Sequence, residues 1–242
     1  MKRQNIRSLV LLISFLLFPI TFYYFSPYVI IMGAMEGIIT GSFLLFITLA
    51  LAAIFFGRAF CAYVCPAGAL QEALEKVNGK PAKIGWRKYI KYAIWIIWII
   101  ILLLLFVTSG GVKKVEPAFM TNRGISVSEI GCYIIYYMVL FLIVITNLLG
   151  GRRAFCHYFC WMAPFMVIGI KVRKLLHLPG LYLEADKDAC VGCKQCTKNC
   201  PMSLQVEESV KGGNLPCTDC ILCGKCVDAC PKHAITYKFK RR

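Results

Sequence analysis

Charged residues are scarce in this chain, and acidic residues are the scarcest. Only 17% of its 242 residues are charged, against about 25% in a soluble domain. The deficit indicates that much of the chain need not face water. Lys and Arg number 28 against 12 Asp and Glu, an excess that by itself suggests a nucleic-acid partner. We reject nucleic acid because the basic residues flank apolar segments, as in the cytoplasmic loops of membrane proteins.

Two cofactor motifs are also missing. The chain has neither a glycine-rich nucleotide fingerprint nor a c-type haem attachment motif. We therefore expect no hydride or haem chemistry from the chain itself.

Long apolar runs, in contrast, are abundant. Four of them reach or approach the roughly 20 apolar residues that a transmembrane helix needs, at positions 9–25, 37–56, 89–107 and 132–149. The first run has a basic start, but it is too long and aromatic for a signal peptide, and no small-residue cleavage site follows it. We predict an uncleaved anchor and a helical membrane bundle of about four transmembrane helices over residues 1–176.

Lys and Arg are unevenly distributed around these runs. Three precede the first run, six lie between the second and third with Lys91 at the very start of the third, and five follow the fourth before residue 177. The two remaining loops hold none and three. Basic residues accumulate on the cytoplasmic side of a membrane. The pattern predicts a multi-pass protein of the inner (cytoplasmic) membrane, in contact with lipid, with both termini in the cytoplasm.

Nine of the fourteen cysteines lie between Cys190 and Cys230. Two runs, starting at Cys190 and Cys220, share the spacing Cys-x2-Cys-x2-Cys-x3-Cys-Pro, which closely resembles that of bacterial ferredoxins with two [4Fe-4S] clusters. In that family three close cysteines hold one cluster and the fourth ligates the other. The resemblance implies a small α+β ferredoxin domain over residues 177–242, with one cluster on Cys190, Cys193, Cys196 and Cys230 and a second on Cys220, Cys223, Cys226 and Cys200.

Zinc sites and disulfides are the alternatives for these cysteines. Zinc usually takes paired Cys-x2-Cys knuckles instead of triple runs, and the cytoplasm disfavours structural disulfides. Cys217 is extra to both runs, and we interpret it as a spare thiol.

A short motif occurs twice in the membrane half. Residues 58–65 and 153–160 are identical at six of eight positions, and each copy follows an even-numbered apolar run. The repeat predicts two duplicated two-helix units that present Cys-x3-Cys pairs at one membrane face. If the units pack together, four thiolates suffice for a third iron–sulfur centre or another metal: Cys61, Cys65, Cys156 and Cys160. The alternative for these cysteines is that they are small apolar residues buried in the core. His157, within the second copy, is a candidate ligand or proton carrier, and the alternative is a polar residue at the membrane interface.

The first copy, continued through Pro66 to Leu70, resembles the Cys-x3-Cys-Pro signature of NapH-type membrane ferredoxins. These proteins accompany periplasmic nitrate reductase systems, and related signatures occur in NosR and in the CcoG copper-reductase family. The expected bundle, the duplicated motif and the C-terminal two-cluster domain match as well, so the likeness covers nearly the whole chain. In the second copy Trp161 follows Cys160, where the family usually has proline.

The resemblance implies quinol- or ferredoxin-linked electron transfer. We expect a subunit of a membrane redox complex, not an enzyme by itself, that relays single electrons between a cytoplasmic redox protein and a membrane quinone or partner subunit. Two alternatives stay open. One is a copper reductase or cofactor-assembly protein that uses the membrane-proximal pairs, since soft thiolates suit Cu(I). The other is a redox-sensing regulatory module.

Overall fold

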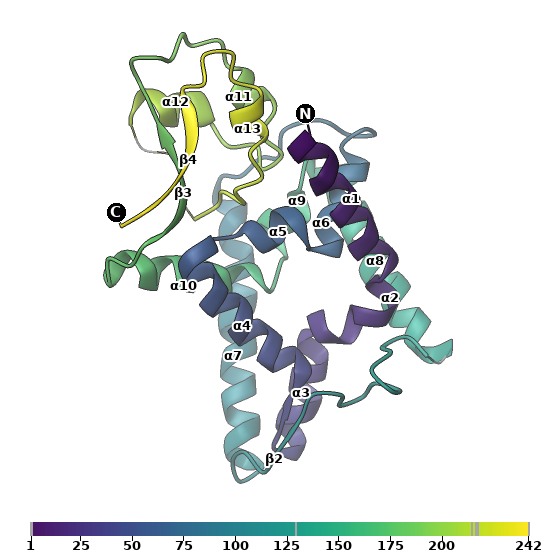
Figure 1. Ribbon diagram of the computed structural model, residues 1–242. Coiled ribbons are helices and arrows are strands. Elements are labelled where there is room, and N and C mark those ends of the chain that lie inside the picture. Colours follow the sequence, from purple (N-terminus) through teal and green to yellow (C-terminus); the bar gives the residue numbers. More distant parts are fainter. Residues whose placement is uncertain (1, 129, 214, 216–217, 242) are drawn as a thin grey trace.

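The computed structural model describes residues 2–128, 130–213, 215 and 218–241. Helices dominate it, and two small sheets join segments far apart in sequence. Residues 180–240 form a C-terminal module. Figure 1 shows this module at one end of the molecule, near both termini, and the helix α3 (Pro27–Glu36) with the strand β2 (Lys114–Glu116) at the opposite end. The elements before the module are α1 (Lys2–Leu16), α2 (Phe18–Thr21), η1 (Phe22–Phe25), α3 (Pro27–Glu36), β1 (Ile38–Thr40), α4 (Gly41–Phe56), α5 (Ala59–Tyr63), α6 (Pro66–Leu74), η2 (Trp86–Tyr89), α7 (Ile90–Thr108), β2 (Lys114–Glu116), α8 (Ile130–Gly150), α9 (Ala154–Tyr158) and α10 (Ala163–Leu175).

The repeated motif has a structural counterpart. In each copy an apolar helix (α4 or α8) leads into a five-residue helix (α5 or α9) and then into a third helix (α6 or α10). The third helices exchange partners, because α10 packs on α4 and α6 packs on α8. Gly169 of α10 lies so close to the backbone of α4 that a side chain would collide with the Ala50 carbonyl. The exchange interlocks the two copies and places α5 beside α9.

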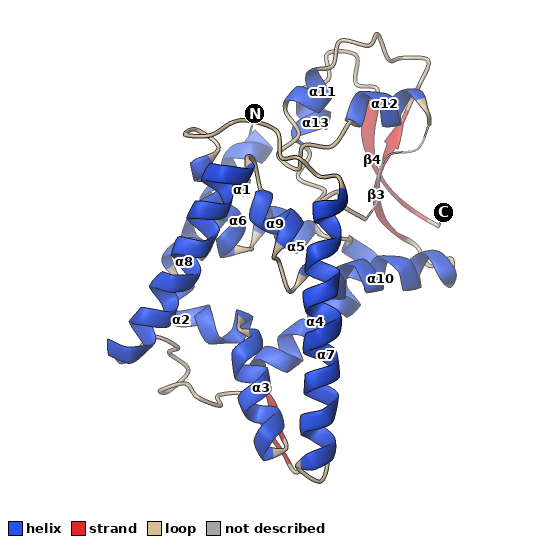
Figure 2. Cartoon of the chain, turned by 180° about the vertical axis from the view of Figure 1, so that it is seen from behind, coloured by secondary structure: helices blue, strands red, loops and turns tan. Residues whose placement is uncertain are grey.

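Among the residues that the structure describes, two helical segments are long and apolar enough to cross a membrane, namely Trp86–Thr108 and Ile130–Gly150. They match the third and fourth predicted runs, and Figure 2 shows both running from the module's end towards the opposite end. The first run is not one straight helix: α1 ends at Leu16, and the segments Arg3–Leu16 and Phe18–Phe25 are bent by 61°. Pro19 explains the break, because its ring clashes with the carbonyl four residues earlier. The segment counts as a third span only if the bent pair crosses as one unit.

The second predicted run is shorter as a helix than as an apolar stretch. Gly37, with φ 74°, ends α3, and residues 38–40 form β1, which pairs in parallel with β2. Thr40 then caps α4, its Oγ1 accepting a hydrogen bond of 3.3 Å from the Phe43 amide. The remaining helix has 16 residues, about 24 Å at 1.5 Å per residue. The number of four spans therefore stays a prediction.

The C-terminal module is small. It contains β3 (Gly180–Ala185), α11 (Gln195–Lys198), α12 (Val206–Lys211), α13 (Lys225–Asp228) and β4 (Ile235–Lys240). Strands β3 and β4 pair antiparallel, with Gly180 opposite Lys240 and Ala185 opposite Ile235. Leu183 and Ile221 of the module belong to the same buried cluster as Phe46 and Met166 of the helical part. The module is thus packed against the helices through a continuous apolar core.

Candidate metal centres

The first candidate centre is a small cavity within the module. Cys190 and Cys193 reach it from the loop after β3, Cys196 from α11, and Cys230 from the chain after α13. Gly192 and Lys194 have positive φ angles of 69° and 57°, which turn the loop around the cavity. This cavity gathers the four cysteines that the sequence assigns to one cluster.

The second cavity is lined by the other predicted set. Cys220 and Cys223 lie in the loop before α13, Cys226 lies on α13, and Cys200 comes from the end of the first run. The structure therefore brings the fourth cysteine of each run to the three close cysteines of the other run. Apolar side chains such as Leu183 and Val206 complete the wall.

The two cavities differ in their access to solvent. Cys193 of the first cavity is exposed, and Cys190 and Cys230 are half-buried. In the second cavity Cys223 and Cys226 are buried, as is Cys200. Burial raises the pKa of the Cys200 thiol, so a metal that binds there must displace a proton. The first cavity faces outward, and the second faces the helical part.

The third candidate centre is built by the repeat. Cys61 and Cys65 of the first copy and Cys156 and Cys160 of the second are all buried, at most 7% exposed, and belong to one core cluster. The backbone amide of Gly68 at the start of α6 acts to lower the pKa of Cys65, and the amide of Ala163 at the start of α10 acts in the same way on the pKa of Cys160. Burial, then the charge of the neighbouring cysteines, raises the pKa of Cys160 to about 12. Amide donors at helix N-termini are groups that stabilise a thiolate.

Buried cations surround these four cysteines. Arg58, Lys91 and Arg153 are at most 1% exposed. Arg58 Nε and Nη2, Lys91 Nζ and Arg153 Nε have no hydrogen-bond partner among the described residues. Burial alone would lower the pKa of Arg58, but Cys61, Cys160 and Cys156 raise it, so the guanidinium stays charged. A buried donor without a hydrogen-bond partner costs free energy of folding. A cluster held by thiolates carries negative charge, which also influences its reduction potential. Such a cluster would therefore suit these buried cations.

Asp219 links this cationic pocket to the module. It lies directly before Cys220, and its carboxylate is 3.6 Å from Lys91 Nζ and 3.9 Å from Arg58 Nη1. The sequence analysis missed Asp219. Acidic residues are rare in this chain, so one directly before the predicted ligand Cys220 could have been singled out as a candidate partner for a basic side chain.

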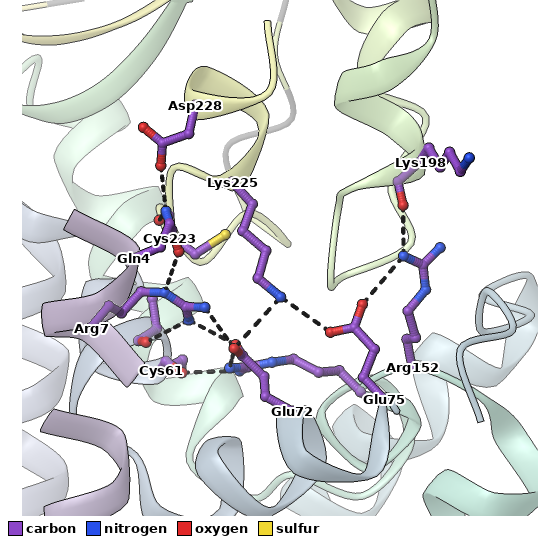
Figure 3. A network of polar contacts seen from close by, with 12 residues as sticks. Gln4, Arg7, Cys61, Glu72, Glu75, Arg152, Lys198, Cys223, Lys225 and Asp228 are labelled. Atoms are coloured by element: carbon purple, nitrogen blue, oxygen red, sulfur yellow. Dashed lines mark hydrogen bonds and ion pairs between the residues drawn. The ribbon is translucent and has the colours of Figure 1, made fainter. Parts of the chain in front are cut away.

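Glu72 of α6 is the centre of a second network between the two parts (Figure 3). Arg7 binds both of its carboxylate oxygens, at 2.8 and 2.6 Å, and Arg153 binds one of them. Lys225 of α13 lies 3.7 Å from the same carboxylate. Burial alone would raise the pKa of Glu72, but Arg153, Arg7 and Lys225 lower it to about 2. The sequence analysis missed Glu72, because nothing in the local pattern names its distant partners.

His157 is not exposed to solvent. It is completely buried, and its Nε2 lies 3.0 Å from the carbonyl oxygen of Met202 in the module. Burial, then the charges of Lys91 and Arg58, lowers the pKa of His157 to about 4, so the ring is neutral at neutral pH. The module covers this position, so the side chain is shielded from solvent, and its place at a membrane interface stays a prediction.

Cys132 lies apart from these centres. Cys132 is half-buried, 3.0 Å from the Tyr23 hydroxyl, and Cys217 lies outside the described residues. The thirteen described cysteines are all free thiols. Within the described part of the chain, no three His, Cys, Asp or Glu side chains are close enough to hold a single metal ion. A mononuclear zinc site would need its sulfurs about 2.3 Å from one point.

Comparison with protein families gives the class of these sites. A 4Fe-4S dicluster domain matches residues 189–235, which contain both cysteine runs of the module. A 4Fe-4S binding domain matches twice, at residues 38–84 and 133–179, and each match contains one copy of the repeated motif. The chain thus carries 4Fe-4S domains of the ferredoxin type and is an iron–sulfur electron-transfer protein.

Each of three relatives either has low sequence identity to this chain or matches only a short part of it. A protein of Methanocaldococcus jannaschii of uncharacterized function is 27% identical over 77% of this chain and 75% of its own length. YccM of Escherichia coli, whose name provisionally describes it as an electron transport protein, is 23% identical over 84% of this chain. The match spans 57% of YccM. A ferredoxin of Methanothermococcus thermolithotrophicus is 40% identical over 22% of this chain and 92% of its own length. No solved structure matches the chain.

Proposed function

We propose that this protein is a membrane-anchored relay that passes single electrons between a cytoplasmic redox partner and a membrane quinone or partner subunit. Three iron–sulfur centres would carry the electrons. Two would lie in the ferredoxin-type module and one where the module meets the membrane helices. The likeness to NapH-type membrane ferredoxins, carried by the Cys-Pro motif at Cys65 and Pro66, favours this role.

The anchoring is supported by the apolar helices and by the charge distribution. Segments Trp86–Thr108 and Ile130–Gly150 have the required length, and the bent first segment and α4 would complete a bundle of about four spans in an inner membrane. Lys and Arg gather in the segments beside the module, where Figure 1 also shows both termini. By the positive-inside rule the module and both termini face the cytoplasm.

The observation that carries the proposal is the third set of cysteines. The interlocked copies bury four thiols between α5 and α9, beside three buried cations, at the face that the module covers. Each copy also falls within a match to a 4Fe-4S binding domain. Cys61, Cys65, Cys156 and Cys160 would hold this centre, and the two cavity sets would hold those of the module.

The protein's own residues shape the electron transfer. Iron–sulfur clusters, when bound, supply reversible one-electron chemistry. Arg58, Lys91 and Arg153 stabilise negative charge at the membrane-proximal centre and thereby favour its reduced form. The apolar wall of the second cavity excludes water, while exposed Cys193 and nearby Lys194 offer a docking point for an acidic cytoplasmic protein.

A copper-reducing or copper-handling role is the second candidate. The Cys61 Sγ lies 3.8 Å from the thioether sulfur of Met166, and thiolates together with thioethers are ligands that Cu(I) prefers. Against exchange of metal with solution, all four cysteines and Met166 are buried.

Reoxidation of the reduced protein tests these roles. The protein in lipid nanodiscs, reduced anaerobically by a viologen, is mixed with a soluble quinone, and the bleached visible absorbance of the clusters is followed. We expect rapid return of the absorbance in the wild type and in the control Cys132→Ser. Cys156→Ser should lose most of the quinone-dependent return, because its relay ends at the module, yet ferricyanide should still oxidise its module.

Two outcomes would count against the relay. If quinone oxidises Cys156→Ser as fast as the wild type, electrons leave by another route. If Cu(II), and not quinone, oxidises the wild type and Cu(I) stays on the protein, the copper role replaces the relay.

A further inference from the structure

The repeated motif differs between its copies at the position directly after the first cysteine. The first copy has Ala62 after Cys61, and the second has His157 after Cys156. In the structure both positions are attached to the module, close to cysteines of its second cavity. The two attachments differ in the number of non-covalent steps that they contain.

The attachment in the second copy has a single non-covalent step. His157 Nε2 and the Met202 carbonyl oxygen are 3.0 Å apart, and both residues are at most 1% exposed. A carbonyl oxygen can only accept, so Nε2 carries the hydrogen and donates it. From Cys156 the route runs through His157, across this hydrogen bond to Met202, and along the backbone through Pro201 to Cys200.

The attachment at Ala62 in the first copy needs three hydrogen bonds (Figure 3). The Gln4 amide donates to the Cys223 carbonyl at 3.0 Å, and Arg7 Nε donates to Gln4 Oε1 at 2.8 Å. Arg7 Nη1 then donates to the Ala62 carbonyl at 3.1 Å. Electron tunnelling decays more slowly through covalent bonds than across non-covalent contacts, so the route with fewer non-covalent steps conducts better.

A further contact of the first copy is a single but longer step. Arg58 Nη1 donates to the Thr218 carbonyl at 3.5 Å, from a position three residues before Cys61.

The segment that receives the His157 bond is held in place independently. Ser203 has a φ of 52°, and its Oγ accepts a hydrogen bond of 2.9 Å from the Ala82 amide. The Ser203 amide in turn donates to the Cys200 carbonyl at 3.1 Å. The Met202 carbonyl therefore keeps its direction towards the imidazole.

We propose that the His157–Met202 hydrogen bond is the principal electron bridge between the second ferredoxin-type centre and the membrane-proximal centre. It is a single step of 3.0 Å from the residue next to Cys156, whereas the Arg58–Thr218 step is longer and the Gln4–Arg7 route has three steps, so these two are minor routes. The inference rests on the proposed function. The step moves one electron, which the centre on Cys200 loses and the centre on Cys156 gains, and no bond breaks and no proton moves. His157 is here a positioning residue that touches neither centre.

Substitutions at His157 and Gln4 separate the routes. Anaerobic protein is mixed with a reduced viologen, and freeze-quench EPR follows the arrival of electrons at the membrane-proximal centre. His157→Leu should slow this arrival several-fold at unchanged iron content and midpoint potentials. His157→Gln, which can again donate to the Met202 carbonyl, should recover most of the rate, and Gln4→Met should slow it less than His157→Leu. Nitrogen chemical shifts of His157 should place its proton on Nε2 without any turnover.

Several results would overturn the bridge. Wild-type transfer in His157→Leu, equal slowing in the Leu and Gln variants, or a proton on Nδ1 each contradicts it. If His157→Leu loses iron, the other two variants decide. A large loss of rate in Gln4→Met makes the Gln4 route the principal one, and slow transfer in His157→Gln with intact iron contradicts the His157 bridge. Near wild-type rates in both variants support it. Failure of the proposed function itself gives a separate result, because the wild type would then lack the EPR signal of a third centre.

Discussion

Glu72→Gln is expected to destabilise the folded protein by about 3–5 kcal/mol, the range for a buried ion pair that loses one partner. The side chains of Arg7 and Arg153 are 1% exposed, and Glu72 is the only carboxylate with which either forms an ion pair within the described residues. The variant therefore leaves two buried guanidinium groups facing each other without compensation. Because Lys225 of the module also pairs with Glu72, the contact between module and helices should loosen. Thermal unfolding in detergent and limited proteolysis between the two parts measure both effects.

Glu75→Gln is the matched control for this prediction. Glu75 lies one turn further along the chain, contacts Lys225 at 3.1 Å and Arg152 at 3.5 Å, and its side chain is 25% exposed. Partly exposed ion pairs contribute about 0–1 kcal/mol, so this change should have little effect. Equal stability losses in the two variants would contradict the central position that we assign to Glu72.

Cys200→Ser should remove the second cluster of the module and leave the first, although Cys200 belongs to the first cysteine run. The loss should be about four irons per chain. The reason is geometric, because Cys200 lines the second cavity together with Cys223 and Cys226. Electrons should still enter the module from a viologen but should no longer reach the membrane-proximal centre. Iron analysis and EPR of the reduced protein measure the two consequences.

Double variants distinguish this crossed arrangement from one in which each run holds its own cluster. If Cys200 and Cys223 share a cluster, the double change to Ser should lose no more iron than either single change. Cys200→Ser combined with Cys190→Ser should lose about eight irons, because two clusters are affected. The opposite pattern would show that each run keeps its fourth cysteine.

The features that follow from local spacing could be predicted from the sequence. The two runs after Cys190 and Cys220 predict which cysteines meet, because loop spacing and a following proline define the chain path around a cluster. The two cavities contain these sets. The repeat at residues 58–65 and 153–160 likewise predicts matched elements, and α5 and α9 have the same length and position in their copies.

The features that depend on distant contacts could not be predicted. The pairing of Glu72 with Arg7 and Arg153 joins three separate parts of the chain, and no pattern near Glu72 specifies it. Burial of His157 results from packing of the module, which hydropathy does not describe. The apolar run at 37–56 hid a strand, because β1 exists through pairing with β2 more than 70 residues later.

The most direct test of the relay is the iron and acid-labile sulfide content per chain, with EPR of the reduced protein, for wild type, Cys61→Ser/Cys156→Ser and the control Cys132→Ser, all purified without air. Three [4Fe-4S] clusters predict about twelve irons in the wild type and the control, and about eight in the double variant, with loss of one EPR component. About eight irons in all three proteins would contradict a membrane-proximal cluster and leave the buried cysteine pairs as packing or metal-exchange residues.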